Sequence, residues 1–112
     1  MQANFADQIT QGFVHIALYQ VRFAGYVVFY LDGDDLFLEN VAVLPECSGK
    51  GIGKALIQYV EHQARTQKLS GVRLYTNEAM SENLSMYPRL GYVETDRRVQ
   101  DGFRRVFFRK SL

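Results

Sequence analysis

The sequence predicts one domain, residues 1–112, with a mixed-sheet α/β (α+β) fold: an antiparallel meander, a strand–helix–strand crossover, a short helix and a C-terminal hairpin. Three observations predict this class. The 112 residues are 47% hydrophobic and 13% aromatic, which suits a single folded core. An apolar, β-branched segment at residues 36–43 is followed by a glycine-rich loop and a long amphipathic helix. Turn signals separate the short apolar segments on both sides of this unit.

The N-terminal third predicts a short helical lead-in and then strands. Phe5 and Ile9 are one helical turn apart and Gly12 follows, so residues 1–11 are expected to be helical. Strands are expected over three ranges: 13–19, 23–31 and 35–43. A turn signal at residues 32–34 precedes the last strand, so the three should form an antiparallel meander.

A long amphipathic helix is expected from Gly51 to about Lys68. Its apolar positions recur at helical spacing, whereas its charged positions, Glu61 among them, are expected to face water. The apolar stripe consists of Ile52, Ala55, Leu56, Tyr59, Val60 and Ala64. The next strand, residues 72–76, should pair in parallel with the strand before the helix, through a right-handed crossover.

The C-terminal third predicts a short helix over residues 81–87, with Ser81 as its cap, and a hairpin. Residues 92–99 and 103–110 flank the hairpin turn at residues 100–102. Arginines are concentrated in this hairpin, which would attract RNA or an acidic partner. The alternative, which we favour over nucleic acid, is a solvated edge that discourages pairing between strands of different molecules.

The composition excludes several kinds of site. No apolar run reaches the roughly 18 residues of a membrane helix, and no secretory signal begins the chain. Cys47 is the single cysteine, so neither an intrachain disulfide nor a cysteine-cluster metal site is expected, and a cytoplasmic location is the simplest expectation. No base can be assigned to Cys47, so we expect no covalent acyl-enzyme. His15 and His62 lie too far apart in sequence to suggest a metal pair, so no metal is expected.

The loop between the strand and the long helix is suited to binding phosphate. Residues 48–53 are Ser-Gly-Lys-Gly-Ile-Gly, and the first N–H groups of a helix have no partner within it. The helix dipole, together with Lys50 and Lys54, adds positive charge there. The alternative is a glycine-rich turn without a ligand.

Two common phosphate loops do not fit this sequence. The nucleoside-triphosphate loop requires a glycine where Ser48 stands and a Ser or Thr where Ala55 stands. The dinucleotide loop requires a glycine at the position of Leu56. Both are therefore excluded.

The loop instead resembles the acetyl-CoA loop of the Gcn5-related N-acetyltransferase (GNAT) family. That signature is Gln/Arg-x-x-Gly-x-Gly/Ala, directly after a strand that ends in a Val-x-Pro-like turn. Here residues 43–45 are Val-Leu-Pro, and both defining glycines, Gly51 and Gly53, are present. Ser48 stands where Gln or Arg is usual. The resemblance implies the GNAT fold and an acetyl-CoA-dependent N-acetyltransferase, in which a primary amine attacks the bound thioester directly.

The resemblance also implies the cofactor contacts. The backbone of Val41 and Val43 would bind the pantetheine arm between two diverging strands, and the N–H of Val41 or Ala42 would polarise the thioester oxygen. In the loop, the expected contacts are Ser48, Gly49, Lys50, Gly51, Ile52, Gly53 and Lys54. Asn83 is the expected amide contact, with Asn77 as the competing choice.

Glu39 is the candidate catalytic base. An alkyl ammonium, with a pKa of about 10.4, must lose a proton before it can attack. Glu39 interrupts an apolar strand, where a carboxylate is costly unless it is solvated or paired. From the residues alone, it is either this base or an exposed carboxylate paired across the sheet. The resemblance favours the base, because polyamine acetyltransferases of the family use a glutamate here through water.

Tyr87 is the candidate catalytic acid. Residues 83–92 resemble the family's second motif, in which a tyrosine before Leu-Gly-Phe/Tyr protonates the CoA sulfur. Without that context, a tyrosine on a short helix is ordinarily a core residue. Pro88 follows Tyr87, which disfavours helical geometry at the tyrosine.

Family members usually begin with another strand and two helices that shape the acceptor site, and only the end of that region is expected here. A homodimer, or another segment, is therefore expected to complete the site. The expected acceptor is a small-molecule amine, and the acidic residues suit a cationic one: Asp32, Asp34, Asp35 and Glu39. The alternative function is a non-catalytic acyl-CoA-binding sensor or interaction module.

Overall fold

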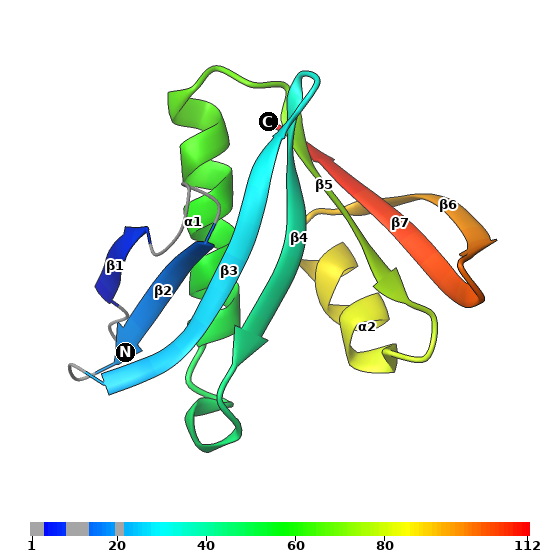
Figure 1. The fold of residues 1–112 in the computed structure, drawn as a ribbon. Helices are drawn as coiled ribbons and strands as arrows, with labels where there is room; N and C mark the ends of the chain where they lie inside the picture. Colours follow the sequence, from blue (N-terminus) through cyan, green and yellow to red (C-terminus); the bar gives the residue numbers. More distant parts are fainter. Residues whose placement is uncertain (1–3, 9–13, 20–21) are drawn as a thin grey trace.

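The computed structural model describes residues 4–8, 14–19 and 22–112. Over these residues the chain forms a seven-stranded sheet, in the order β1-β2-β3-β4-β5-β7-β6, and two α-helices (Figure 1). The strands are β1 (Asn4–Gln8), β2 (Val14–Tyr19), β3 (Arg22–Asp32), β4 (Asp35–Val43), β5 (Gly71–Asn77), β6 (Val93–Gln100) and β7 (Phe103–Ser111). The helices are α1 (Ile52–Thr66) and α2 (Ser81–Arg89), and a short 3₁₀ turn covers Pro45–Cys47. In this part of the chain neither helix is both long and apolar enough to cross a bilayer.

The sheet confirms the predicted mixed α/β fold. β2, β3 and β4 form the antiparallel meander, and β5 pairs in parallel with β4 after the α1 connection. β6 and β7 form the C-terminal hairpin, with β7 between β5 and β6. In the hairpin turn, Asp101 and Gly102 have φ angles of +53° and +80°. Two consecutive left-handed residues make a type I′ turn, which suits the twist of the paired strands.

The prediction of a helix over residues 1–11 is wrong for the part that the structure describes. Residues 4–8 form β1, which pairs antiparallel with β2 at the edge of the sheet. The spacing of Phe5 and Ile9 is a weak signal, because a short segment is stable only through its tertiary pairing. Ile9 itself lies outside the described residues. β1 is therefore a strand that the sequence pattern did not predict, and five residues separate it from β2, too few for two helices.

Two local predictions at α2 are also corrected. Ser81 is the first helical residue, and Met80 occupies the cap position without a side-chain hydrogen bond. Pro88 lies inside the helix, so Tyr87 has helical geometry after all. Pro88 has no N–H to bond the Leu84 carbonyl one turn earlier, so the helix lacks one backbone bond in its last turn. The helix closes with the Tyr92 N–H bonded to the Tyr87 carbonyl at 3.0 Å.

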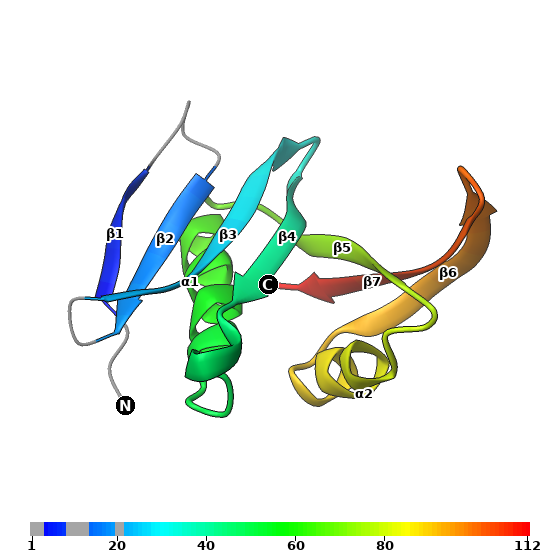
Figure 2. The same cartoon turned by 60° about the horizontal axis from the view of Figure 1, so that its bottom comes forward.

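Both helices cover one face of the sheet (Figure 2). Strand residues of that face are buried against α1, and Tyr87 of α2 packs on the ring of Phe108 at 5.7 Å between centroids. The buried strand residues include Val27, Leu36, Leu38, Val72, Leu74, Val106 and Phe108. The other face carries the alternate residues of the same strands, among them Phe37, Tyr75 and Phe107. In the described ranges, this second face has no helix over it.

β6 is the edge strand at the C-terminal side of the sheet, and its side chains are almost all exposed. Two of its arginines, Arg97 and Arg98, pair with carboxylates of the same strand, Glu94 and Asp96. Charged, self-paired side chains on an edge strand fit the solvated-edge interpretation of the basic hairpin rather than a nucleic-acid surface.

A buried polar cluster ties α1 to the C-terminal strand. Glu61 is only 4% exposed, which corrects the expectation that it faces water. The Tyr92 hydroxyl donates to Glu61 Oε2 at 2.9 Å, and Lys110 Nζ donates to Oε1 at 3.2 Å. The position is buried because β7 and the residue before β6 pack on this side of α1, so the carboxylate needs both donors.

Replacing Lys110 by methionine should lower the free energy of unfolding by about 3 kcal/mol, because Glu61 would stay buried without its cation. Urea unfolding at neutral pH measures this loss. The matched control is Arg97→Met, which breaks an exposed ion pair with Glu94 and should change stability little. Equal losses in the two variants would contradict the importance of the buried pair.

Candidate functional site

The glycine loop leaves backbone donors exposed at the start of α1. Gly49 and Gly51 have φ angles of +78° and +76°, a backbone conformation that other residues adopt only with strain. Gly51 caps α1 without a side-chain hydrogen bond. The first bond of the helix runs from the Ala55 N–H to the Gly51 carbonyl at 3.0 Å, so the N–H groups of residues 52–54 lie outside the helical ladder. Together with the helix dipole, these amides suit an anion.

Ser48 closes the turn that precedes these amides. Its hydroxyl donates to the Pro45 carbonyl at 2.7 Å, and its N–H donates to the same oxygen at 3.2 Å. The side chain that stands where Gln or Arg is usual in the family therefore folds back on the 3₁₀ turn. Its contribution at this position is to shape the loop.

A cavity of about 540 Å³ runs from the loop, along β4, to α2. Most of the predicted cofactor contacts line it: Val41, Val43, Ser48, Gly49, Gly51, Ile52, Gly53, Lys54, Asn83 and Tyr87. Ala42 and Lys50 are not among the lining residues. Ala42 alternates with Val41 and Val43, so its side chain faces the other side of the sheet.

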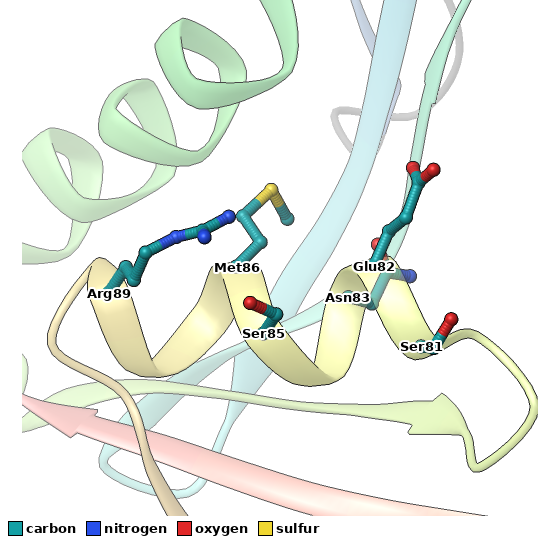
Figure 3. A pocket seen from close by; sticks show the side chains of 6 residues that line it. All are labelled: Ser81, Glu82, Asn83, Ser85, Met86 and Arg89. Atoms are coloured by element: carbon teal, nitrogen blue, oxygen red, sulfur yellow. The ribbon is translucent and has the colours of Figure 1, made fainter.

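The α2 side of this cavity was not foreseen from the sequence, apart from Asn83 and Tyr87. Glu82 and Met86 also line the cavity. They continue into an open hollow along α2, where Glu82, Met86 and Arg89 project from one side of the helix (Figure 3). The spacing of these three residues, three or four apart, is the sequence signal that could have identified them.

A second cavity, of about 210 Å³, lies where β4 and β5 part. The two strands pair over residues 35–38 and 71–74 and then diverge, as Figure 1 shows. Glu39 and Tyr87, far apart in the sequence, both line this opening. It shares Val41, Asn83 and Tyr87 with the loop cavity, so the two cavities adjoin. The opening between β4 and β5 agrees with the predicted divergence of these strands.

Glu39 is the extra residue of a β-bulge in β4. Phe29 pairs with Leu38 and Val28 with Asn40, which leaves Glu39 without a cross-strand partner. Its side chain is exposed, and the ion pairs of the described residues do not include it. The alternative of a carboxylate paired with a cross-strand cation is thus not supported. The sequence signal for the bulge is the pair of polar residues that interrupts the strand's alternation.

Tyr87 is 5% exposed and packs edge-on against Tyr92 at 5.5 Å between ring centroids. Burial raises the pKa of the Tyr87 phenol to about 12. The phenol therefore stays protonated across the physiological range and is able to donate a proton there.

The structure separates the two competing asparagines. Asn83 Nδ2 donates to Thr76 Oγ1 at 3.1 Å, and Asn83 lines both adjoining cavities. Asn77 Oδ1 instead accepts the Ala79 N–H at 2.8 Å in the turn after β5, and Asn77 lines a different cavity. Only Asn83 is thus in a position to contact a ligand between the strands.

The histidines and the cysteine have no metal-binding arrangement. His15 is buried and is hydrogen-bonded through Nδ1 to the Tyr59 hydroxyl at 2.9 Å, while His62 is exposed on α1. Cys47 is half-buried in the wall of the loop cavity. Within the described ranges, no three His, Cys, Asp or Glu side chains are grouped closely enough to hold a metal ion.

Comparison with known proteins identifies the family to which this sequence is similar. The family model described as the acetyltransferase (GNAT) family matches residues 2–92. None of the curated proteins matches the sequence.

Several solved structures share the fold. Nourseothricin acetyltransferase is 22% identical with a TM-score of 0.78, over 88% of this chain and 64% of that one. The ribosomal-protein-S18-alanine N-acetyltransferase from Escherichia coli is 18% identical with a TM-score of 0.80, over 93% and 71%. A GNAT family acetyltransferase from Elizabethkingia anophelis, with acetyl-CoA bound, is 20% identical with a TM-score of 0.78, over 88% and 75%. At these identities the likeness extends to the fold alone, and the chain spans less than two thirds of the first of these proteins.

The substitution Gly53→Glu should weaken anion binding while leaving the fold intact. A Cβ added at Gly53 would meet only Val43 Cγ2, at an ordinary 3.6 Å, and an acidic side chain in the first turn suits the helix dipole. We expect Gly53→Glu to weaken CoA binding at least tenfold in calorimetry, without a lower melting temperature. Gly53→Ala, which adds the Cβ alone, is the control. Unchanged CoA affinity in Gly53→Glu would show that the amides do not bind the anion.

Proposed function

Because this chain belongs to the acetyltransferase (GNAT) family, we propose that it is an acetyl-CoA-dependent N-acetyltransferase acting on a primary amine. The observation that carries this proposal is the opening between β4 and β5, lined by Glu39 and Tyr87 and adjoining the glycine-loop cavity. A donor set for a pyrophosphate and a candidate acid and base thus lie in two adjoining cavities. We further propose that residues 1–112 form a single catalytic domain.

The residues present fit acetyl-CoA. The amides of residues 52–54 and the ammonium of Lys54 would bind the pyrophosphate, because they are the donors exposed at the helix end. The backbone of Val41 and Val43 would bind the pantetheine arm, and Asn83 would contact its amides. Acetyl-CoA, when bound, supplies the thioester that the amine attacks.

Two side chains of this protein would move the protons. Glu39, exposed at the opening, would accept a proton from the ammonium group of the acceptor, directly or through water. Tyr87 would donate its phenolic proton to the departing CoA sulfur, and solvent would restore that proton. The phenol is protonated at neutral pH, as the second step requires.

Tyr87→Phe should lower kcat about 100-fold and leave CoA affinity within about twofold, because the ring packing on Phe108 is retained.

In the wild type, the rate should rise with pH as the acceptor amine is deprotonated. Since burial raises the pKa of Tyr87 to about 12, this phenol should cause no loss of activity until the pH approaches that value. Steady-state rates across the pH range measure both effects, and wild-type turnover of Tyr87→Phe would remove its role as the acid.

Glu39→Gln should lower kcat/KM at neutral pH about tenfold or more, with unchanged CoA affinity. The deficit should shrink at high pH, where the amine is already neutral. Glu46→Gln removes another exposed carboxylate, in the 3₁₀ turn beside the loop, and is the matched control. If the two variants have the same pH–rate profile, Glu39 is not the base.

A non-catalytic acyl-CoA-binding module is the second candidate function. It is favoured by the face of the sheet that has no helix over it in the described ranges. CoA should protect the protein against thermal unfolding under either function, because it binds the folded state. Release of free thiol from acetyl-CoA upon addition of amines should occur only if the protein is an enzyme, and its absence across a broad amine panel would support the module.

Three further features stay predictions: a small-molecule acceptor, a homodimer and a cytoplasmic location. Sedimentation of the purified protein at working concentration tests the dimer, and a fully active monomer would remove it.

A further inference from the structure

The face of the sheet that has no helix over it in the described ranges carries a row of aromatic rings, the aromatic floor, which reaches the opening between β4 and β5. Rings of Tyr30, Phe37, Tyr75 and Phe107 follow one another across β3, β4, β5 and β7, with successive centroids 5.5, 5.7 and 5.5 Å apart. Tyr75 also lines the opening, together with Glu39.

Most charges on this face are already neutralised. Arg109 holds Asp35 in two hydrogen bonds of 2.9 Å, and Arg73 pairs with Asp32. Two of the acidic residues that suggested a cationic acceptor are therefore engaged within the protein. Arg98, over the Phe107 ring at 4.4 Å, pairs with Asp96.

Arg105 differs from these arginines because its side chain bonds to a neutral acceptor rather than to a carboxylate. Its guanidinium lies 4.3 Å from the centroid of the Tyr75 ring, and Nη1 donates to Gln100 Oε1, a neutral acceptor, at 3.1 Å. Among the residues that the structure describes, no carboxylate lies within ion-pair distance of Arg105. A half-buried guanidinium without a counter-charge favours an anion, with which it makes paired hydrogen bonds.

We propose that Arg105 is an acceptor-binding residue that recognises an anionic group, a carboxylate or a phosphate, on the amine to be acetylated. This inference rests on the proposed function. The acceptor would be zwitterionic: its ammonium group lies at Glu39, its apolar part lies over Phe37 and Tyr75, and its anionic group pairs with Arg105. A polycationic amine would instead bring positive charge to an arginine that lacks a carboxylate partner, which is unfavourable.

Matched acceptors test this assignment in the wild-type protein. Each anionic amine is paired with its neutral-ended counterpart: L-phenylalanine with 2-phenylethylamine, ω-amino acids with n-alkylamines of equal length, and 2-aminoethyl phosphate with ethanolamine. We expect at least one anionic series to exceed its counterpart tenfold or more in kcat/KM, and α,ω-diamines to be the poorest acceptors. The amino-acid and phosphate arms identify the source of the anion. Diamines or neutral amines that equal the anionic acceptors would overturn the proposal.

Arg105→Gln should abolish the preference for the anionic acceptor, mainly through KM, while CoA affinity and turnover of the neutral amine change less than twofold. Arg98→Gln, which removes an arginine that stacks on Phe107 but has a carboxylate partner, is the control and should keep the preference. If Arg105→Gln folds poorly, two measurements replace it. One is the same acceptor comparison in Arg105→Lys, and the other is calorimetric binding of the preferred acceptor to the CoA-loaded wild type. A preference retained in Arg105→Gln would refute the role. If no amine releases thiol, the proposed function itself fails; if only uncharged or dicationic amines do, this inference alone fails.

Discussion

Two parallel strands that pair over four residues and then part are the constraint on which the rest of this structure depends. Beyond Leu38 and Leu74, the facing edges of β4 and β5 no longer bond to each other, and a backbone edge away from its ladder needs other partners. The bulge at Glu39 stands at this point of divergence, and α2 reaches the same opening through Asn83 and Tyr87. Sheet, bulge and helix together therefore line the two adjoining cavities.

The two faces of the sheet differ in what covers them. One is sealed by α1 and α2, so the glycine loop and Tyr87 sit on a rigid, buried support. The other has no helix over it in the described residues, and its aromatic side chains are screened by one another and by the arginines above them. Cation–π contacts of this kind let a half-exposed apolar surface persist in water. The proposed cofactor contacts line the cavity on the helix side, and Tyr75 of the aromatic face lines the opening that adjoins it.

Local patterns in the sequence were sufficient for much of this fold. The apolar stripe of α1, the glycine loop and the two-residue hairpin turn each depend on residues close in the chain, and their bounds agree with the structure within a few residues. Long-range features were not readable in the same way. Residues 4–8 are a strand because β2 lies beside them, and Glu61 is buried because Lys110 and Tyr92 reach it from distant segments. The bulge at Glu39 depends on register with β3, and the isolation of Arg105 is visible only once the carboxylates of the sheet have found their partners.

A crystal structure with acetyl-CoA bound tests the central claim most directly. We expect the pyrophosphate to lie on the amides of residues 52–54, the pantetheine arm to bond to the edge of β4, and the acetyl group to sit in the opening beside Tyr87. Acetyl-CoA bound elsewhere, or a helix end that stays empty at saturating acetyl-CoA, would contradict it.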